Sequence, residues 1–440
     1  MAASDHQSSS TTALLTDGTI THIHHHNTHQ HGETQHVARP GEADTQAPYS
    51  NTQTPPSTIT INHGTNNITP YTPPTDVISI FVVTFDSKEG NVLEWYMPQE
   101  LALEGIEFRA LISGAHTITS DFIFFRQGDY YGVACYEKLT IISDVERGAR
   151  MKSIGVIVSN YYAIHQHLEY LAQQVRNMVV KPGDYSGLEE YYLSRKASIP
   201  SSWDTPQKVT HQLLPPTVIH NLTPVLGEGI FHLVKFFGEQ LIILWKATLL
   251  CKRILLFSPP PIGPVCGRVH SISLLSAHST PGLPTQLLRP LFYISIADMD
   301  LLQEQHSYVA CTTEKIFEEK TGVCDIYVEN QSVRIPGILR RVLVVTPEDR
   351  KRLASLHHIA RSSHNSIVDF RRFFQDLNNQ IFSTLYHICN SDSAVMKDKD
   401  IGAIGLNPRQ DKAFVRELAM THGFDLTVSK ASWMCCPCNS

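Results

Sequence analysis

The chain has 440 residues, of which 42% are hydrophobic and 18% are charged, so it can form two or three domains with hydrophobic cores. The formal net charge is −6, and the sequence indicates no clustered basic face. Nucleic-acid binding needs such a face, so nucleic acid is not an expected partner. We expect no membrane span, since no segment approaches ~20 uninterrupted apolar residues, and we expect no secretory signal. Nine scattered cysteines are typical of a reducing compartment, and the cytoplasm is the expected location.

Residues 1–76 are predicted to be a disordered, low-complexity tail. They are rich in His, Ser, Thr and Pro, and their six acidic residues against Arg39 alone carry −5 of the net charge. Nine of the 23 histidines lie here, so imidazole binding of a metal ion is one interpretation. Incidental metal affinity of a polar tail is the other, and we expect no dedicated metal site and no cofactor.

Residues 77–180 predict a domain with a mostly antiparallel sheet and helices. Five β-branched or aromatic runs, separated by turn residues, are typical of strands: Ile78–Phe85, Asn91–Tyr96, Asp121–Arg126, Tyr130–Tyr136 and Ser153–Ser159. Apolar residues spaced 3 and 4 apart from Tyr161 to Met178 predict an amphipathic helix, and a shorter helix is expected near Pro98–Phe108.

A connecting segment with short helical pieces is expected at residues 181–220, after the breaker Lys181-Pro-Gly. Residues 221–345 then alternate between helical and strand patterns, which predicts an α/β core. The helices are expected at Gly227–Phe237 and Glu239–Leu250, and the strands at Lys252–Ser258, Leu291–Ile296, Tyr308–Thr312 and Asp325–Val328. Charged residues such as Lys246 interrupt the apolar run from Phe231 to Phe257, so this run indicates a core segment, not a membrane anchor.

Residues 346–430 predict a helical part. Thr346-Pro-Glu-Asp is a helix start signal, and a continuous apolar stripe runs from Ile367 to Ile388. Neither this part nor the rest of the chain contains a phosphate-binding loop, a dinucleotide fingerprint or a hydrolase elbow, so a metabolic enzyme is the least favoured class.

Residues 431–440 form a cysteine-rich tail. Cys435, Cys436 and Cys438 stand beside Trp433, and reversible acylation of these cysteines would supply one weak membrane anchor. Pro437 occupies the fourth position from the end, so the prenylation motif fails. The alternative is an unmodified tail, because unpaired cysteines often behave as small hydrophobes.

The run Glu146-Arg-Gly-Ala-Arg-Met-Lys152 places three cations before the fifth predicted strand. Such a loop could bind an acidic protein surface or a lipid headgroup. Alternatively, Arg147 and Arg150 pair with neighbouring acids at the surface, an arrangement that contributes little to stability.

These residues also carry a family resemblance. Ile80-Phe-Val-Val-Thr-Phe85, Glu146-Arg-Gly-Ala-Arg-Met-Lys-Ser-Ile-Gly155 and Leu244-Trp-Lys-Ala247, with Tyr308–Phe317, resemble the LCHN branch of the DENN-domain proteins over roughly residues 77–430. The resemblance implies an α/β (α+β) fold: a longin-like domain at 77–180, an α/β DENN core at 221–345 and a helical DENN part at 346–430.

The resemblance also implies a guanine nucleotide exchange factor for a Rab-type small GTPase, acting in membrane trafficking and associating with membranes only peripherally. Such a factor makes no bond, so the missing catalytic motifs are expected. A non-catalytic longin/DENN scaffold or tether is the alternative, and a GTPase-activating protein with Arg147 as an arginine finger is a third reading. As GTPase contacts we name Asp86, Arg147, Arg150 and Lys152; Trp245 is expected to lie in the core.

Overall fold

The computed structural model describes residues 75–142, 146, 148–203, 230–281, 288, 290–362 and 366–429. The histidine-rich part of the predicted tail, Arg147, most of the connecting segment after Trp203, and Cys435, Cys436 and Cys438 lie outside the described residues.

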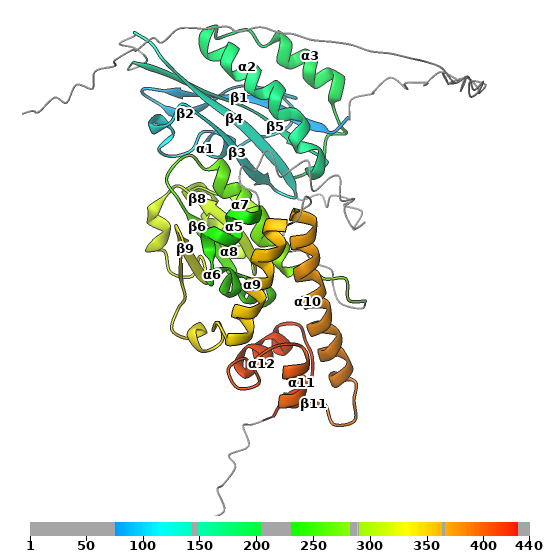
Figure 1. Ribbon diagram of the computed structural model, residues 1–440. Helices are drawn as coiled ribbons and strands as arrows, with labels where there is room; N and C mark the ends of the chain where they lie inside the picture. The colour runs from blue at the N-terminus through cyan, green and yellow to red at the C-terminus, as the bar shows by residue number, and fades with distance from the viewer. Residues whose placement is uncertain are drawn as a thin grey trace, which may run out of the picture. The chain divides into compact units, whose positions relative to one another are not determined.

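The first half of the fold is an antiparallel sheet, drawn from blue to cyan in Figure 1. The five predicted strands are confirmed as β1 (Val77–Asp86), β2 (Gly90–Met97), β3 (Ser120–Gln127), β4 (Tyr130–Thr140) and β5 (Ala149–Val158), in the order β3-β4-β5-β1-β2. Two boundaries differ by four residues: β4 ends at Thr140 and not at Tyr136, and β5 begins at Ala149 and continues the ladder with β4 through Arg150 and Lys152. Backbone pairing with a long neighbouring strand therefore extends β5 into the charged run that was expected to be a loop.

Two glycines allow aromatic rings to lie flat on this sheet. A Cβ atom on Gly155 would lie 2.4 Å from Cζ of Phe81, and one on Gly132 would lie 2.2 Å from Cζ of Phe125. Both rings are fully buried. Gly155 at the end of the charged run is thus required by packing.

Helices cover one face of the antiparallel half. The predicted helix of residues 161–178 forms η2 (Tyr161–His167), a 3-10 segment, followed by α2 (Leu168–Val180), and α3 (Ser186–Arg195) follows. Helix α2 contacts β4 and β5, and α3 contacts β1, as Figure 1 shows.

The helix expected near Pro98–Phe108 is wrong over most of its length, since α1 spans only Ile106–Ala110, and η1 (Ala115–Thr117) follows it. Leu101 and Leu103 are buried in the turn that precedes α1. The spacing of these apolar side chains therefore matches a helical pattern, although the segment is a turn.

The second half is built on parallel strands. It comprises α5 (Ile230–Phe237), α6 (Gln240–Leu249), β6 (Arg253–Phe257), α7 (Gly263–Ser273), η3 (Leu274–Ser276), β7 (Pro290–Tyr293), η4 (Ile296–Asp298), α8 (Met299–Glu304), β8 (Tyr308–Thr312), η5 (Lys315–Glu318), β9 (Ile326–Glu329), β10 (Ser332–Arg334) and η6 (Leu339–Arg341). Strands β7, β8, β6 and β9 are parallel neighbours, and β10 closes the edge antiparallel to β9. The predicted strands and helices of this half are confirmed, and α7, α8 and β10 are additional.

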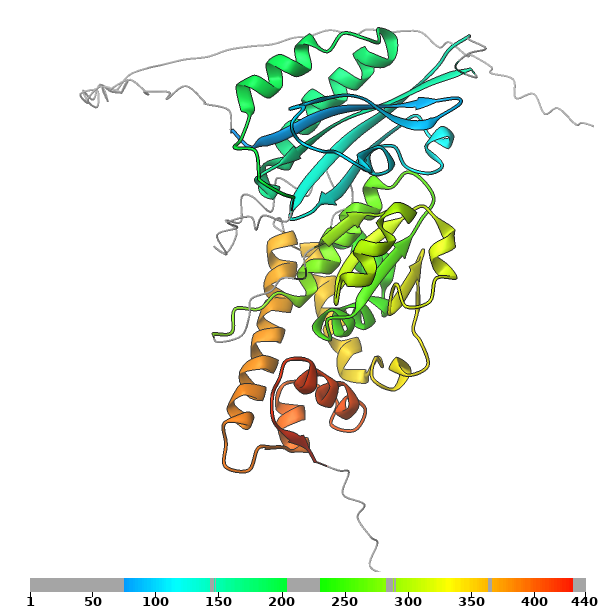
Figure 2. The same ribbon diagram turned by 180° about the vertical axis from the view of Figure 1, so that it is seen from behind.

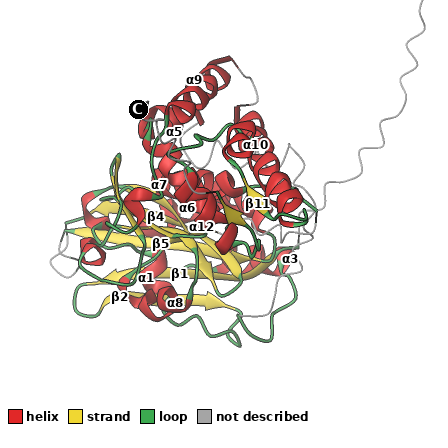
Figure 3. Ribbon diagram, turned by 90° about the horizontal axis from the view of Figure 1, so that it is seen from below, coloured by secondary structure: helices red, strands yellow, loops and turns green. Residues whose placement is uncertain are grey.

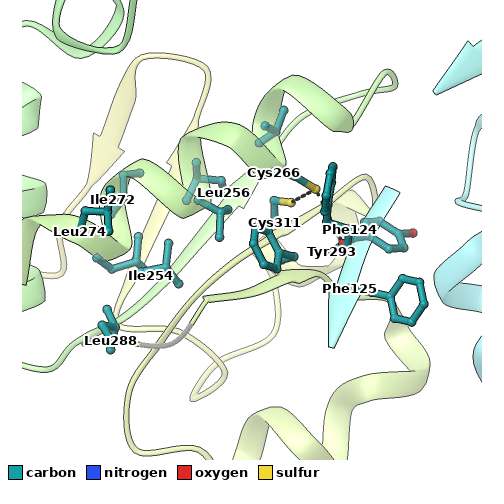
Figure 4. Packing of buried hydrophobic residues seen from close by; sticks show 14 of the residues in the cluster. Phe124, Phe125, Ile254, Leu256, Cys266, Ile272, Leu274, Leu288, Tyr293 and Cys311 are labelled. Carbon is teal, nitrogen blue, oxygen red and sulfur yellow. Dashed lines mark hydrogen bonds between the residues drawn. The ribbon is translucent and has the colours of Figure 1, made fainter. Parts of the chain in front are cut away.

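The two halves share one ten-stranded sheet, because β7 pairs with β3 through Phe292 and Phe125. Helix α7 packs across this seam. Its Cys266 lies with Sγ 3.7 Å from Sγ of Cys311 on β8 and close to Phe124 on β3 (Figure 4).

Asp121 on β3 also links β3 to the start of α7, at the junction between the two halves of the sheet. Its Oδ2 accepts a hydrogen bond from the backbone N of Ile262 at 2.6 Å, and its Oδ1 accepts from Gly263 at 3.1 Å and from Phe122 at 2.9 Å. A carboxylate at a helix N-terminus satisfies unpaired amides and interacts favourably with the helix dipole. Burial nevertheless raises the pKa of Asp121, and the three backbone bonds oppose that rise.

The C-terminal part is helical, as predicted, with α9 (Pro347–Ser362), α10 (Ser366–Cys389), α11 (Asp398–Ala403) and α12 (Lys412–Thr421), and with short strands β11 (Val395–Met396) and β12 (Thr427–Val428). Thr346 and Asp349 cap α9 reciprocally: Oδ2 of Asp349 accepts from the Thr346 N at 3.0 Å, and Oγ1 of Thr346 accepts from the Asp349 N at 3.3 Å. The predicted stripe of α10 is confirmed by its buried residues Phe370, Phe374, Ile381 and Leu385.

A buried charge cluster joins this part to α6. Nζ of Lys246 lies 2.6 Å from Oδ2 of Asp349, 2.7 Å from Oδ1 of Asp411 and 2.7 Å from the carbonyl oxygen of Val344. The side chains of Lys246 and of both aspartates are 0% exposed. Arg352 adds a second cation, with Nη1 at 2.7 Å from Oδ1 of Asp349.

Candidate interaction surface

The predicted contact residue Asp86 lies at the tip of the β1–β2 hairpin. Its Oδ1 accepts hydrogen bonds from the backbone N of Lys88 at 2.7 Å and of Glu89 at 3.0 Å. These two bonds lower the pKa of the exposed carboxyl group. The side chain thus shapes the turn, and its role as a GTPase contact stays a prediction.

The side chains of Arg150 and Lys152 both have partners within the chain. The Arg150 guanidinium binds the Glu146 carboxylate through Nε at 2.9 Å and Nη2 at 2.7 Å, while Nη1 donates to the carbonyl oxygen of Val179 at 2.8 Å. The predicted pairing with Glu146 is therefore confirmed. Lys152 is 4% exposed, and its ammonium group is paired with Glu94. A partner could reach Lys152 only by displacing Glu94, so the contact roles of both cations remain predictions.

A second surface lies where the two halves of the sheet meet, and it was not predicted. Three side chains there, Phe108 on α1, Ile296 on η4 and Ile316 on η5, are apolar yet 44%, 44% and 49% exposed. Helix α1 belongs to the antiparallel half, whereas η4 and η5 belong to the parallel half. Figure 3 shows the sheet from below with α1 and α8 labelled, and the Arg109–Asp298 ion pair joins α1 to η4, the segment that α8 continues. We call these three residues the junction surface.

Polar contacts hold the three segments of the junction surface together. The guanidinium of Arg109, next to Phe108, forms an ion pair with Asp298 at the end of η4, with Nε at 3.0 Å from Oδ1. The backbone N of Ile296 donates to Oε2 of Glu314, two residues before Ile316, at 2.7 Å. Burial raises the pKa of Glu314.

Asp298 is itself fixed by its capping interaction, in which Oδ2 accepts from the Ser295 N at 2.8 Å. The ion pair with Arg109 is thus built on a positioned carboxylate, with Asp298 2% exposed. The ion pair and the hydrogen bonds therefore fix the segments that carry the three exposed apolar side chains, so these segments need not be ordered on binding.

Periodicity could not have found this surface. The three segments are short, and an exposed Phe or Ile in a short segment has the same sequence signal as a buried one. Trp245, by contrast, is 0% exposed, as predicted, and its Nε1 donates to Oδ1 of Asn378 at 2.9 Å.

A membrane-spanning helix and a metal site are both absent from the described residues. Across these residues no helix is long and apolar enough to cross a membrane, and no group of three His, Cys, Asp or Glu side chains is arranged to hold a metal ion. A recess beside Phe257, Ser258 and Arg268, at the carboxyl end of β6, has an interior volume of about 10 Å³. That is room for one water molecule.

Comparisons with known proteins identify relatives over most of the chain. Residues 80–337 match the family model described as "DENN domain-containing protein 11". The protein of that name from Xenopus laevis is 38% identical over 380 residues, covering 82% of this chain and 87% of its own. Those from Danio rerio and Mus musculus are also 38% identical, covering 82% of this chain and 78% and 83% of their own lengths.

Proposed function

Since the chain belongs to the DENN domain-containing protein 11 family, a family of DENN-domain proteins, we propose that it is a guanine nucleotide exchange factor for a Rab-type small GTPase. In this proposal residues 77–180 form the longin-like part, residues 221–345 the DENN core and residues 346–430 its helical extension. The membership itself implies a regulator of membrane trafficking.

Exchange of this kind requires differential binding and breaks no covalent bond. The exchange factor binds the switch regions of the GTPase, moves them away from nucleotide and magnesium, and so stabilises the nucleotide-free state. Cellular GTP then refills the site. A surface of suitable shape and polarity is sufficient, and a proton-transfer or nucleophilic group is unnecessary.

The junction surface is the observation that carries this proposal. Phe108, Ile296 and Ile316 come from both halves of one sheet, and the Arg109–Asp298 ion pair sets their spacing. A partner that contacts both halves buries more area than either half could offer alone, which a stable complex needs. Apolar side chains surrounded by positioned charges also match the anatomy of a protein interface.

The second candidate function is a scaffold or tether without exchange activity. The two functions differ in nucleotide preference: an exchange factor binds nucleotide-free GTPase most tightly, whereas a scaffold of the effector kind prefers the GTP form. A GTPase-activating role for Arg147 would instead require that Arg147→Ala abolishes stimulated hydrolysis.

The test is release of a fluorescent GDP analogue from purified Rab GTPases, with and without the full-length protein in solution. We expect acceleration for one or a few members of the panel. Silence across the panel, with the protein shown to be folded, would contradict exchange activity and favour the scaffold.

Variants then test the surface. Phe108→Ser with Ile296→Ser should reduce the exchange rate by about tenfold or more if these residues are the central anchors, since truncation of such hot-spot residues costs about 2 kcal/mol or more. Met420→Ser, at a methionine that is 62% exposed on α12, is the matched control and should leave exchange unchanged. Equal exchange rates for the double variant and the control would show that the junction surface is not part of the interface with the GTPase.

A further inference from the structure

The loop between β10 and α9 displays an exposed apolar residue beside two arginines. Residues 335–345, called here the Ile338 loop, leave the sheet after Arg334 and end at Thr346, where α9 begins. Ile338 is 85% exposed, and Pro336, Gly337, Arg340 and Arg341 around it are also exposed. In Figures 1 and 2 this loop is the yellow segment that projects from the parallel half before α9.

The loop is ordered, although its tip is apolar. Within η6 the backbone N of Leu339 donates to the Pro336 carbonyl oxygen at 3.0 Å, and the N of Leu343 donates to the Leu339 carbonyl oxygen at 2.8 Å. Leu339 and Leu343 are 8% and 2% exposed and belong to the main hydrophobic core. The core therefore anchors the loop and leaves Ile338 in water.

The charge of the loop has one sign. Between Glu329 and Glu348 the sequence contains Arg334, Arg340 and Arg341 and no acidic residue. Arg334 is paired with Glu318 and Glu329, so its charge is balanced on the sheet side. Arg340 uses Nε to bind the Ile335 carbonyl oxygen at 3.3 Å, which leaves the cationic group at the surface beside Ile338.

We propose that the Ile338 loop binds an anionic lipid bilayer, with Ile338 entering the headgroup region and Arg340 and Arg341 contacting acidic headgroups. One apolar side chain flanked by two cations combines the two contributions that attract a protein segment to an anionic membrane, apolar burial and attraction to acidic headgroups. A protein partner is the less suitable occupant, because one exposed isoleucine falls far short of the roughly 800 Å² per partner that a standard interface buries. The proposal does not depend on exchange activity, which is measured without membranes.

The experiment is vesicle flotation of the full-length, bacterially produced protein, whose terminal cysteines carry no acyl chains. Vesicles of phosphatidylcholine alone are compared with a mixture of phosphatidylcholine and phosphatidylserine, at about 0.1 M salt. The protein is expected to float with the anionic vesicles and to bind them more weakly as salt is raised. Absence of binding to the anionic vesicles, or equal binding to both kinds, overturns the proposal.

Paired variants assign the binding to the loop. Arg340→Glu/Arg341→Glu should lower the partition coefficient by about fivefold or more per residue, the contribution of one cation near an anionic surface. Arg361→Glu/Arg416→Glu, at two other exposed arginines, changes the net charge equally and should have little effect. Equal losses of binding in both double variants would show that only the net charge matters. That result would refute the assignment of membrane binding to the Ile338 loop.

A second set of variants tests the contribution of the apolar Ile338 side chain to membrane binding. Ile338→Ser should weaken partitioning by about tenfold, whereas Ile199→Ser, at an isoleucine that is 46% exposed, should not. Ile338→Trp should strengthen partitioning, because tryptophan favours the interfacial region. Since Ile338 makes little contact with the core, these variants should keep the unfolding midpoint of the parent. Unchanged partitioning in both Ile338 variants would overturn the insertion.

Discussion

Replacement of Lys246 by methionine should be among the most damaging single changes in the chain. Lys246→Met keeps an unbranched side chain, one atom shorter, and removes the positive charge from between Asp349 and Asp411, which lie 2.6 and 2.7 Å from Nζ. Both carboxylates are 0% exposed, so water cannot replace the ammonium group. Removing one partner of a buried ion pair costs roughly 3–5 kcal/mol, because a charge is left buried and uncompensated. Here that charge is Asp411, since Asp349 keeps its ion pair with Arg352.

The matched control is Lys252→Met, at a lysine that follows the end of α6. Lys252 pairs with Glu417 on α12 at 3.3 Å, but the two side chains are 21% and 31% exposed. Solvent screens such a pair, and Lys252→Met should therefore cost at most about 1 kcal/mol. The two variants make the same chemical change, so the difference between them isolates the effect of burial.

Urea unfolding monitored by circular dichroism measures both costs through the transition midpoint and its slope. Hydrogen exchange should also show faster exchange of the α12 amides in Lys246→Met, because Asp411 precedes α12 and holds it to α6. The reasoning would be refuted if Lys246→Met were no more destabilising than Lys252→Met.

Two further changes probe the seam between the halves of the sheet. Burial, assisted by Arg371, lowers the pKa of His270 from 6.5 to about 4, and Nδ1 of His270 lies 2.7 Å from Oη of Tyr161. Because the folded-state pKa is depressed, this stability is present above pH 6.5 and is lost as pH falls toward 4, by about 3 kcal/mol. His270→Gln should remove that part of the pH dependence, and identical pH–stability curves for parent and variant would contradict it. Asp121→Ala leaves buried amides at the start of α7 without an acceptor and should lower the free energy of unfolding in urea by about 2 kcal/mol. If the loss of stability were no larger than that of Asp86→Ala, at an exposed turn, the cap would be dispensable.

Sequence periodicity by itself determined the order and type of most elements. The five strands of the first half, the stripe of α10 and the capped start of α9 at Thr346 were all predicted, because each depends on residues within a few positions of one another. The family resemblance likewise rested on contiguous motifs. Boundaries were weaker where a neighbouring strand supplied the hydrogen bonds, as in the extension of β5 to Ala149.

Only the tertiary structure decided what the charged residues do. Asp349 and Asp411 lie 103 and 165 residues from Lys246 in the chain, so no local pattern shows that this lysine is buried between them. The same holds for Asp121, whose partners in α7 lie 141 and 142 residues away, and for Arg109 and Asp298, which are 189 residues apart. Such pairs form when packing brings distant segments together. The pairing of β3 with β7 does so for Asp121 and Arg109, and the packing of α6 against the C-terminal part does so for Lys246.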